Sequence, residues 1–125
     1  MQLQDPDTII RNTDPALLTL LAEKLNTLVK WDVMQFFHRN PHAMDTVGQI
    51  AEALGRDLES VASTTAELAE AGLLQMRRGA NATVFMLADD EAIRKEIDAF
   101  MCACDNATFR RCAIQYVLNA STDGN

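Results

Sequence analysis

Glycine and proline are scarce in this sequence, with five glycines and three prolines among 125 residues. Long flexible linkers are built largely from such residues, so the chain has little from which to make one. Its length is that of a single domain, and an apolar content of 48% is too high for a disordered chain. We therefore expect one compact domain over residues 15–120, preceded by a flexible N-terminus over residues 1–14.

Basic residues are also scarce: 11 Lys and Arg stand against 18 Asp and Glu, which gives a net charge of −7. Such a charge keeps a protein soluble but does not favour phosphate backbones or anionic membranes as partners of the whole molecule. DNA is not excluded, because the charge on one face counts for more than the total. The acidity lowers the expectation of a nucleic-acid partner without removing it.

Membrane spans and secretion signals are missing. No stretch of about 18 apolar, uncharged residues could span a bilayer. The first seven residues lack the basic region and apolar run of a secretion signal. The three cysteines are an odd number crowded near the C-terminal end, which is unlike a secreted disulfide framework. We expect a cytoplasmic protein without membrane contact.

Catalytic and metal-binding motifs are missing as well. The sequence has no glycine-rich phosphate loop, nucleophile elbow or His-Glu pair at metal-ligand spacing, so we expect neither an enzyme nor a cofactor. Cys102 and Cys104 would point about 200° apart on a helix and cannot face one ion together. Cys104 and Cys112 could share a face, which leaves metal or thiol sensing as the alternative to core packing. His38 and His42, on either side of a proline, are interpreted as a surface pair.

Apolar residues at three- and four-residue steps are what the sequence does have, and they begin after a helix-start signal. Asp14 can cap a helix whose first residue is Pro15. One long helix with a kink, or two abutting helices, should follow over residues 15–39. Pro41 disfavours helical structure in Asn40 and ends this region.

Two short helices with a glycine-containing turn between them are predicted over residues 46–72. Thr46 can cap the first helix, and Gly55 can take the left-handed position that ends it. Asp57 can cap the second helix, which Gly72 ends. This order is a helix-turn-helix.

A β-hairpin is predicted directly afterwards, over residues 73–88. Its strands are 73–76 and 83–87, and the residues between them have turn chemistry. A helical region over residues 90–120 follows, with Asp89 or Asp90 as its cap and an interruption at Asp105 and Asn106. The expected core consists of large apolar residues from all these segments: Trp31, Phe36, Phe37, Ile50, Leu54, Val61, Leu68, Leu73 and Phe85.

The segments 47–55 and 61–74 resemble winged helix-turn-helix regulators of bacteria and archaea, of the ArsR and MarR kind. The ending Leu68-Ala69-Glu70-Ala71-Gly72-Leu73-Leu74 is typical of their second helix where it runs into the wing. The resemblance covers about residues 31–88. It implies a mainly α fold with a small β-hairpin wing and extra N- and C-terminal helices, and a DNA-binding transcriptional regulator.

In helix-turn-helix proteins the second helix enters the major groove of DNA. Its exposed positions here should be Glu59, Ser60, Ser63 and Thr64, with Ala62 among them and Arg56 just before the helix. Hydroxyl groups can hydrogen-bond bases or phosphates. The helix carries carboxylates and no Lys or Arg, however, which weighs against base-specific recognition.

The hairpin tip supplies the positive charge. Arg77 and Arg78 lie beside Gly79 and Asn81, where such proteins reach phosphates or the minor groove. We interpret Arg77, Arg78 and Asn81 as DNA-binding residues, together with Arg56 and the exposed residues of the second helix, Glu59, Ser60, Ser63 and Thr64. The alternative is that the two arginines only keep an exposed turn soluble.

The terminal segments 17–29 and 93–118 carry more apolar surface than a small core can cover. Large uncovered apolar faces mark interfaces, so we expect a homodimer through the N- and C-terminal helices. The alternative is that these helices cover one another within one chain. A second function also stays open: a winged-helix protein-interaction module that docks a partner on the acidic second helix.

Overall fold

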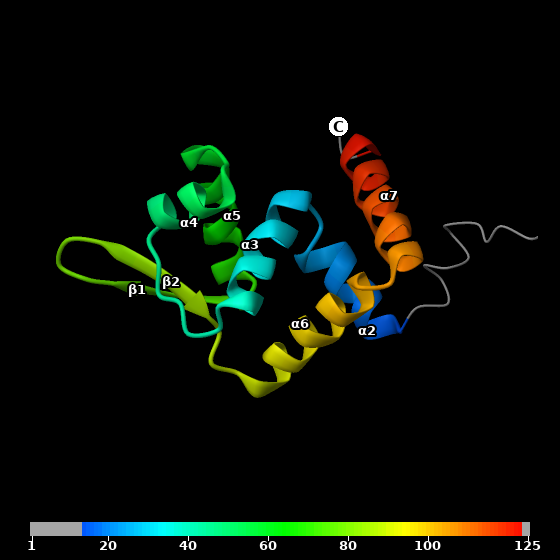
Figure 1. The fold of residues 1–125 in the computed structure, drawn as a ribbon, viewed down its shortest axis with the longest axis horizontal. Helices are drawn as coiled ribbons and strands as arrows, with labels where there is room; N and C mark the ends of the chain where they lie inside the picture. Colours follow the sequence, from blue (N-terminus) through cyan, green and yellow to red (C-terminus); the bar gives the residue numbers. More distant parts are fainter. Residues whose placement is uncertain (1–13, 124–125) are drawn as a thin grey trace, which may run out of the picture.

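The computed structural model describes residues 14–123, with side chains up to residue 119 (Figure 1). This part of the chain contains six α-helices, one π-helical segment and one two-stranded antiparallel hairpin. Their order is α2 (Pro15–Thr19), η1 (Leu20–Lys24), α3 (Leu28–Arg39), α4 (Val47–Leu54), α5 (Leu58–Glu70), β1 (Leu74–Arg78), β2 (Thr83–Leu87), α6 (Glu91–Cys104) and α7 (Ala107–Asp123). Apart from Asp14, the predicted flexible N-terminus lies outside the described residues.

The N-terminal helical region is broken in the middle. Asp14 caps α2 by accepting from the Ala16 amide at 2.8 Å, as predicted. The chain then widens into the π-helical turn η1, where the Leu25 amide donates to the Leu20 carbonyl at 2.7 Å. The Trp31 indole N–H donates to the Leu25 carbonyl at 2.6 Å, which ties the break to the next helix. Residues 15–39 therefore form two helical stretches, α2 continued by η1 and then α3, and α3 ends at Arg39, just before Asn40, as predicted.

The helix-turn-helix forms where the sequence predicts it. The Thr46 hydroxyl accepts from the Gln49 amide, and the Gln49 side chain accepts from the Thr46 amide, which completes a capping box at the start of α4. Gly55 has a φ of +66° and ends α4 in the left-handed conformation that favours glycine. Asp57 caps α5 through the Ser60 amide at 2.9 Å.

The predicted hairpin is confirmed, and one residue outside it, Asp45, forms a bridge to its second strand. Leu74 pairs with Leu87 at the base of the hairpin, and Arg78 pairs with Thr83 next to the turn. Asp45, just before α4, forms an isolated bridge with Phe85 through two backbone hydrogen bonds of 2.8 and 3.1 Å. Sequence reasoning missed this bridge, which ties the wing (residues 73–88) to the start of the helix-turn-helix.

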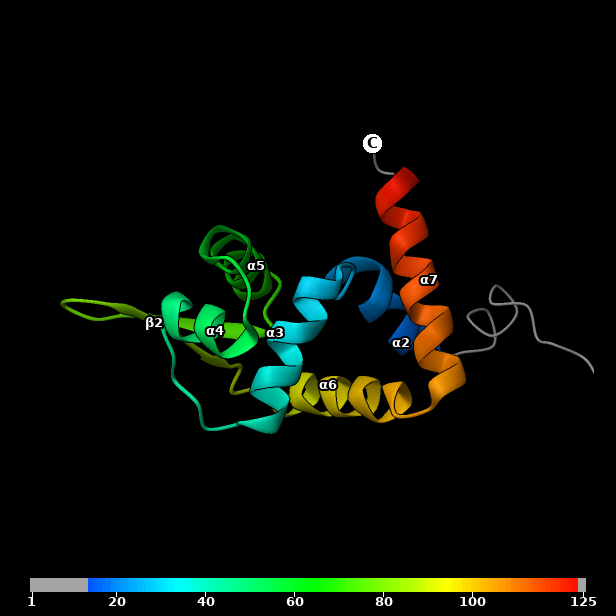
Figure 2. The same ribbon diagram turned by 45° about the horizontal axis from the view of Figure 1, so that its top comes forward.

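The C-terminal region is two helices with a break at the predicted position. Asp90 caps α6 by accepting from the Ile93 amide at 3.1 Å. The break at Asp105 and Asn106 is followed by α7, which leaves α6 at a large angle (Figure 2). The wing and α7 lie at opposite ends of the molecule, with α3 between them (Figure 1).

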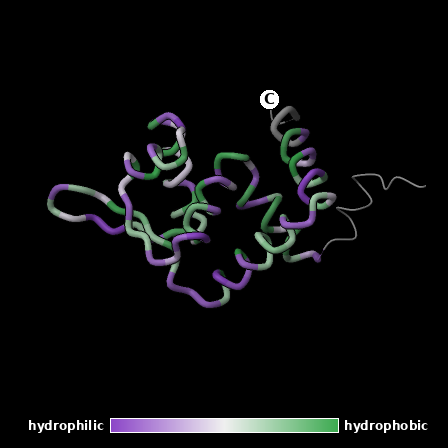
Figure 3. Tube along the Cα trace, in the orientation of Figure 1, coloured by the Kyte–Doolittle hydropathy of each residue, from purple (hydrophilic) through white to green (hydrophobic). Residues whose placement is uncertain are grey.

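One cluster of buried apolar side chains connects these elements, from Leu20 in η1 to Val117 in α7. Hydrophobic residues gather where the helices meet, while the loop from β2 into α6 is hydrophilic (Figure 3). Of the predicted core residues, Trp31, Phe36 and Leu54 are only half-buried and pack against this cluster. No helix between residues 14 and 123 is long and apolar enough to cross a membrane.

Candidate nucleic-acid interface

The outward face of α5 carries small side chains and one carboxylate near its start. Glu59, Ala62, Ser63 and Ala66 are exposed, at the three- and four-residue steps that bring residues to one helix face. The Ser63 hydroxyl donates to the Ser60 carbonyl at 3.2 Å and keeps its oxygen free to accept. Ser60 itself is half-buried. A face of small residues allows a partner to approach the helix backbone closely.

Thr64 is not on this face, contrary to the sequence prediction. It is 7% exposed and lies beside Thr65, which is fully buried. Both occupy the stripe between Val61 and Leu68 that packs toward the core, because residues three and four apart share a face. The Thr65 hydroxyl donates to the Val61 carbonyl at 2.9 Å, so this buried polar group is satisfied within the helix.

Arg56 is exposed only in part, and its charge is already paired. Its Nε and Nη2 both donate to Oδ2 of Asp32 in α3, at 2.8 and 2.6 Å. Arg56 therefore ties the turn of the helix-turn-helix to α3, and it is not the free cation that the sequence suggested.

The carboxylates of α5 differ in what they contact. Asp57 is the cap of the helix. Glu67 pairs with Lys30 of α3 at 2.9 Å. Glu59 and Glu70 are exposed and form no ion pair with another described residue. The unpaired negative charge of this helix therefore lies near its two ends.

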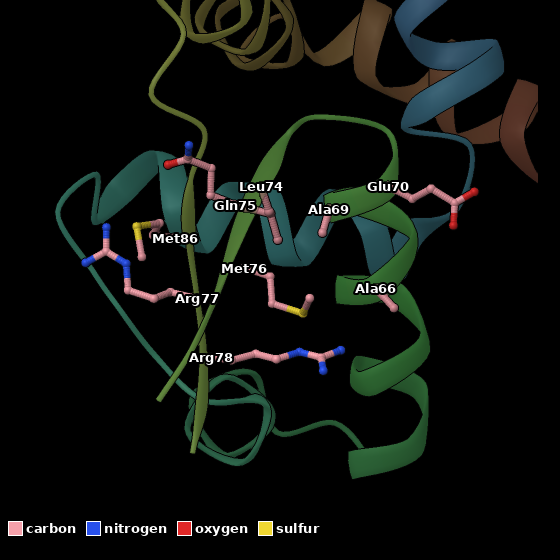
Figure 4. Close-up of a pocket in the computed structure, with 9 residues that line it drawn as sticks. All are labelled: Ala66, Ala69, Glu70, Leu74, Gln75, Met76, Arg77, Arg78 and Met86. Atoms are coloured by element: carbon pink, nitrogen blue, oxygen red, sulfur yellow. The ribbon is translucent and has the colours of Figure 1, made fainter. Parts of the chain in front are cut away.

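The two wing arginines are the last residues of β1 rather than part of the turn. They are exposed and form no ion pair within residues 14–119. Neighbouring residues in a strand point to opposite faces, and Arg78 points toward α5 whereas Arg77 points to the other side (Figure 4). Asn81 is exposed in the turn, which the Gly79 amide closes by donating to the Ala82 carbonyl at 2.7 Å.

A groove of about 650 Å³ separates the wing from α5 (Figure 4). Its walls include Ala66 and Ala69 from α5, and Met76 and Arg78 from β1, with Glu70 at the edge. Met76 is 47% exposed, and sequence reasoning did not single it out for this surface. The two-residue period of β1 could have found it, because Met76 shares a strand face with Arg78.

The cysteines and histidines do not form a cluster. Cys102 is exposed, Cys104 is half-buried and Cys112 is buried. His38 contacts Asp98 of α6 at 2.7 Å, while His42 is exposed. Within the described residues, no three His, Cys, Asp or Glu side chains are grouped so that they could hold a metal ion.

The terminal helices cover much of their apolar surface on one another. Leu20, Leu21 and Leu25 are buried, and α7 buries Cys112, Ala113 and Val117 in the same cluster. What α7 leaves exposed is Tyr116, at 37%, and Leu118, at 46%. The apolar surface available to a partner is therefore smaller than the sequence suggested.

The fold is similar to that of solved structures. One is the solution structure of the homodimeric winged helix-turn-helix DNA-binding domain, fragment 1–100, of a possible ArsR-family transcriptional regulator from Mycobacterium bovis. The likeness covers 84% of this chain and 89% of that one, with a TM-score of 0.59 and 15% sequence identity. No protein-family model and no curated protein matches the sequence. The chain has the winged helix-turn-helix fold, mainly helical with a hairpin wing, as the resemblance of its sequence predicted.

Proposed function

We propose that this protein is a DNA-binding transcriptional regulator that works as a homodimer in the cytoplasm. One observation carries the proposal: Arg78, which has no ion pair within the described residues, lies across a groove from Ala66, at the C-terminal end of the small-residue face of α5. In winged-helix proteins the second helix enters the major groove and an adjacent basic wing can hold the phosphates. The similar domain from Mycobacterium bovis is described as DNA-binding and homodimeric, which supports the same reading.

The residues fall into two groups by role. Glu59, Ser60 and Ser63 would face the bases, and Ala62 and Ala66 would let the helix approach them. Arg77, Arg78 and Asn81 would contact the sugar-phosphate backbone. Arg56 would act through Asp32 by fixing the turn between the helices, and Thr64 has no contact role because it is buried.

The dimer would use Tyr116, which α7 leaves 37% exposed. Leu118 lies two residues further along and faces a different side of the helix, so it is not part of this contact. A two-fold contact through α7 would leave both wings free, because the wing lies at the other end of the molecule (Figure 1). Light scattering at several concentrations tests this: Tyr116→Glu should yield a monomer, and an unchanged dimer would contradict the contact.

Salt dependence of binding tests the DNA proposal. Two arginines on each wing give four phosphate contacts per dimer, and each should add about −0.9 to the slope of log K against log salt. The expected slope is near −3.6, measured by fluorescence anisotropy with a pool of labelled duplexes. Arg78→Gln should remove about half of it, whereas Lys95→Gln, on the exposed side of α6, should leave it unchanged. Absence of salt-sensitive binding at low salt would refute the proposal.

A second function is favoured by one observation: Leu58 is 57% and Met76 is 47% exposed, both close to the acidic side chains of α5. Exposed apolar residues rimmed by charge are typical of protein interfaces. In this case the chain is a protein-interaction module, and Met76→Asp should abolish capture of the partner in a pull-down. Salt-sensitive DNA binding that survives Met76→Asp would favour the regulator instead.

We further propose that residues 15–120 form a single domain, since one buried cluster includes side chains from η1 to α7. Limited proteolysis should leave that segment intact, and cleavage between the wing and α6 would argue for two units.

A further inference from the structure

A second pocket, of about 310 Å³, lies between α3, α6 and α7, with Arg56 from the turn of the helix-turn-helix at its wall. Its volume is at the lower end of the range for sites that hold small molecules. Apolar side chains make up most of its walls: Leu28 and Trp31 from α3, Phe100 and Met101 from α6, and Ile114 from α7. The pocket lies outside the candidate nucleic-acid interface.

The aromatic wall of this pocket is held in place. The Trp31 indole N–H donates to the Leu25 carbonyl at 2.6 Å, which fixes the plane of the ring. Phe100 meets the Trp31 ring edge to face, with the centroids 5.4 Å apart and the planes at 74°. A wall whose side chains are already ordered costs a ligand little conformational entropy on binding.

Among the residues that line the pocket, positive charges outnumber negative ones by one, while Asp105, whose charge also acts on Cys104, does not line it. Arg56 and Arg110 both line it, and Asp32 is the single carboxylate among the lining residues. Burial raises the pKa of the Cys104 thiol to about 11, so this group stays neutral at pH 7 and does not offset the arginines. An anion is therefore favoured over a cation at this position.

Both arginines have donors left for a ligand. A guanidinium has five N–H groups on a planar fork. Asp32 accepts from Nε and Nη2 of Arg56, and Nη1 has no hydrogen bond to another described residue. Arg110 donates through Nη1 to the Cys104 carbonyl at 2.8 Å and keeps its remaining donors. Each free fork side matches the geometry of a carboxylate.

We propose that this pocket binds a small organic acid, with its aryl or branched alkyl body against Trp31 and Phe100 and its carboxylate between Arg56 and Arg110. The bound carboxylate shares Arg56 with Asp32, and Arg56 is the side chain that ties the turn of the helix-turn-helix to α3. The role of such an acid as an effector rests on the proposed DNA-binding function, whereas its binding does not.

Trp31 makes the test direct, because it is the single tryptophan of the chain and lines the pocket. Purified full-length protein is titrated with phenylacetate, cyclohexanecarboxylate and octanoate while tryptophan emission is recorded, with phenylacetamide as the uncharged control. At least one acid should give a saturable change in emission and a rise in melting temperature. Phenylacetamide should bind about tenfold more weakly than phenylacetate or not at all, because it lacks the charge-assisted hydrogen bonds.

A pair of neighbouring variants provides the control. Arg110→Gln removes one guanidinium from the pocket and should weaken binding about tenfold, while Arg111→Gln changes an exposed arginine that does not line it. Absence of a saturable change with all three acids would overturn the proposal, as would equal affinities of the two variants or of the acid and its amide. A protein that binds the acid but not DNA would refute the proposed function alone.

Discussion

Replacing glycine by alanine should change the stability of the protein in opposite directions at Gly48, inside α4, and at Gly55, which ends α4. Gly48 is in the first turn of α4, and a Cβ there would meet its nearest atom, Thr46 Oγ1, at 3.9 Å. At Gly55 a Cβ would meet nothing within 4 Å, but the residue has a φ of +66°. Space is sufficient at both positions, so the backbone conformation alone decides the sign.

The magnitudes follow from helix propensity and from the left-handed penalty. Alanine in a helix is about 0.5–1 kcal/mol more favourable than glycine, so Gly48→Ala should stabilise the protein by up to that amount. A residue with a Cβ in the left-handed region costs about 1–2 kcal/mol, which the reduced freedom of the unfolded chain offsets only in part. Gly55→Ala should therefore destabilise the protein by about 1 kcal/mol, and the two variants should differ by roughly 6 °C in melting temperature.

Urea and thermal unfolding, followed by circular dichroism, measure both variants. Protein concentration is held fixed, because self-association would make the melting temperature depend on it. The dependence of the unfolding free energy on urea should be the same in both, since neither change alters the surface exposed on unfolding. The reasoning is refuted if Gly55→Ala is neutral, or if both substitutions shift stability in the same direction.

Three further outcomes are expected. Leu68→Ala opens a cavity under α5, where the side chain is fully buried, and should cost about 2–5 kcal/mol in urea unfolding; a loss below 1 kcal/mol would contradict its place in the core. A double-mutant cycle of Asp32→Asn and Arg56→Gln should give a coupling of up to about 1 kcal/mol, since both side chains are partly exposed; additive effects would show that the pair does not form. With the other cysteines changed to serine, alkylation of Cys104 by iodoacetamide should rise about tenfold per pH unit between pH 8 and 10, because its pKa is raised to about 11, whereas a plateau below pH 9 would contradict the burial.

The elements could be predicted because their limits depend on contacts between near neighbours in the sequence. Asp14, Thr46, Asp57 and Asp90 each accept from an amide two or three residues further on. A capping side chain and its amide are therefore visible in one short window of sequence. The π-helical turn η1 and the bridge between Asp45 and Phe85 were missed, because tertiary packing and a contact across forty residues decide them.

The candidate site was less predictable, because exposure and pairing depend on distant residues. Thr64 and Ser63 are adjacent and chemically alike, and only the packing of α5 against its neighbours buries the first and exposes the second. Arg56 looks like a free cation in the sequence, since Asp32 precedes it by 24 positions. The opposite directions of Arg77 and Arg78 could not be predicted either, because the strand was expected to end at Met76, whereas β1 continues to Arg78.

The number of carboxylates in α5 overstates how strongly this helix repels DNA, because some of these charges are offset by neighbouring groups in the structure. The charge of the capping Asp57 is offset in part by the positive N-terminal end of α5, and that of Glu67 by Lys30. The unpaired carboxylates are Glu59 and Glu70, near the two ends of the helix, and the exposed small residues lie between them. The middle of α5 can therefore approach a phosphate-lined groove at a lower electrostatic cost than the composition of the helix implies, provided that the wing arginines supply the attraction.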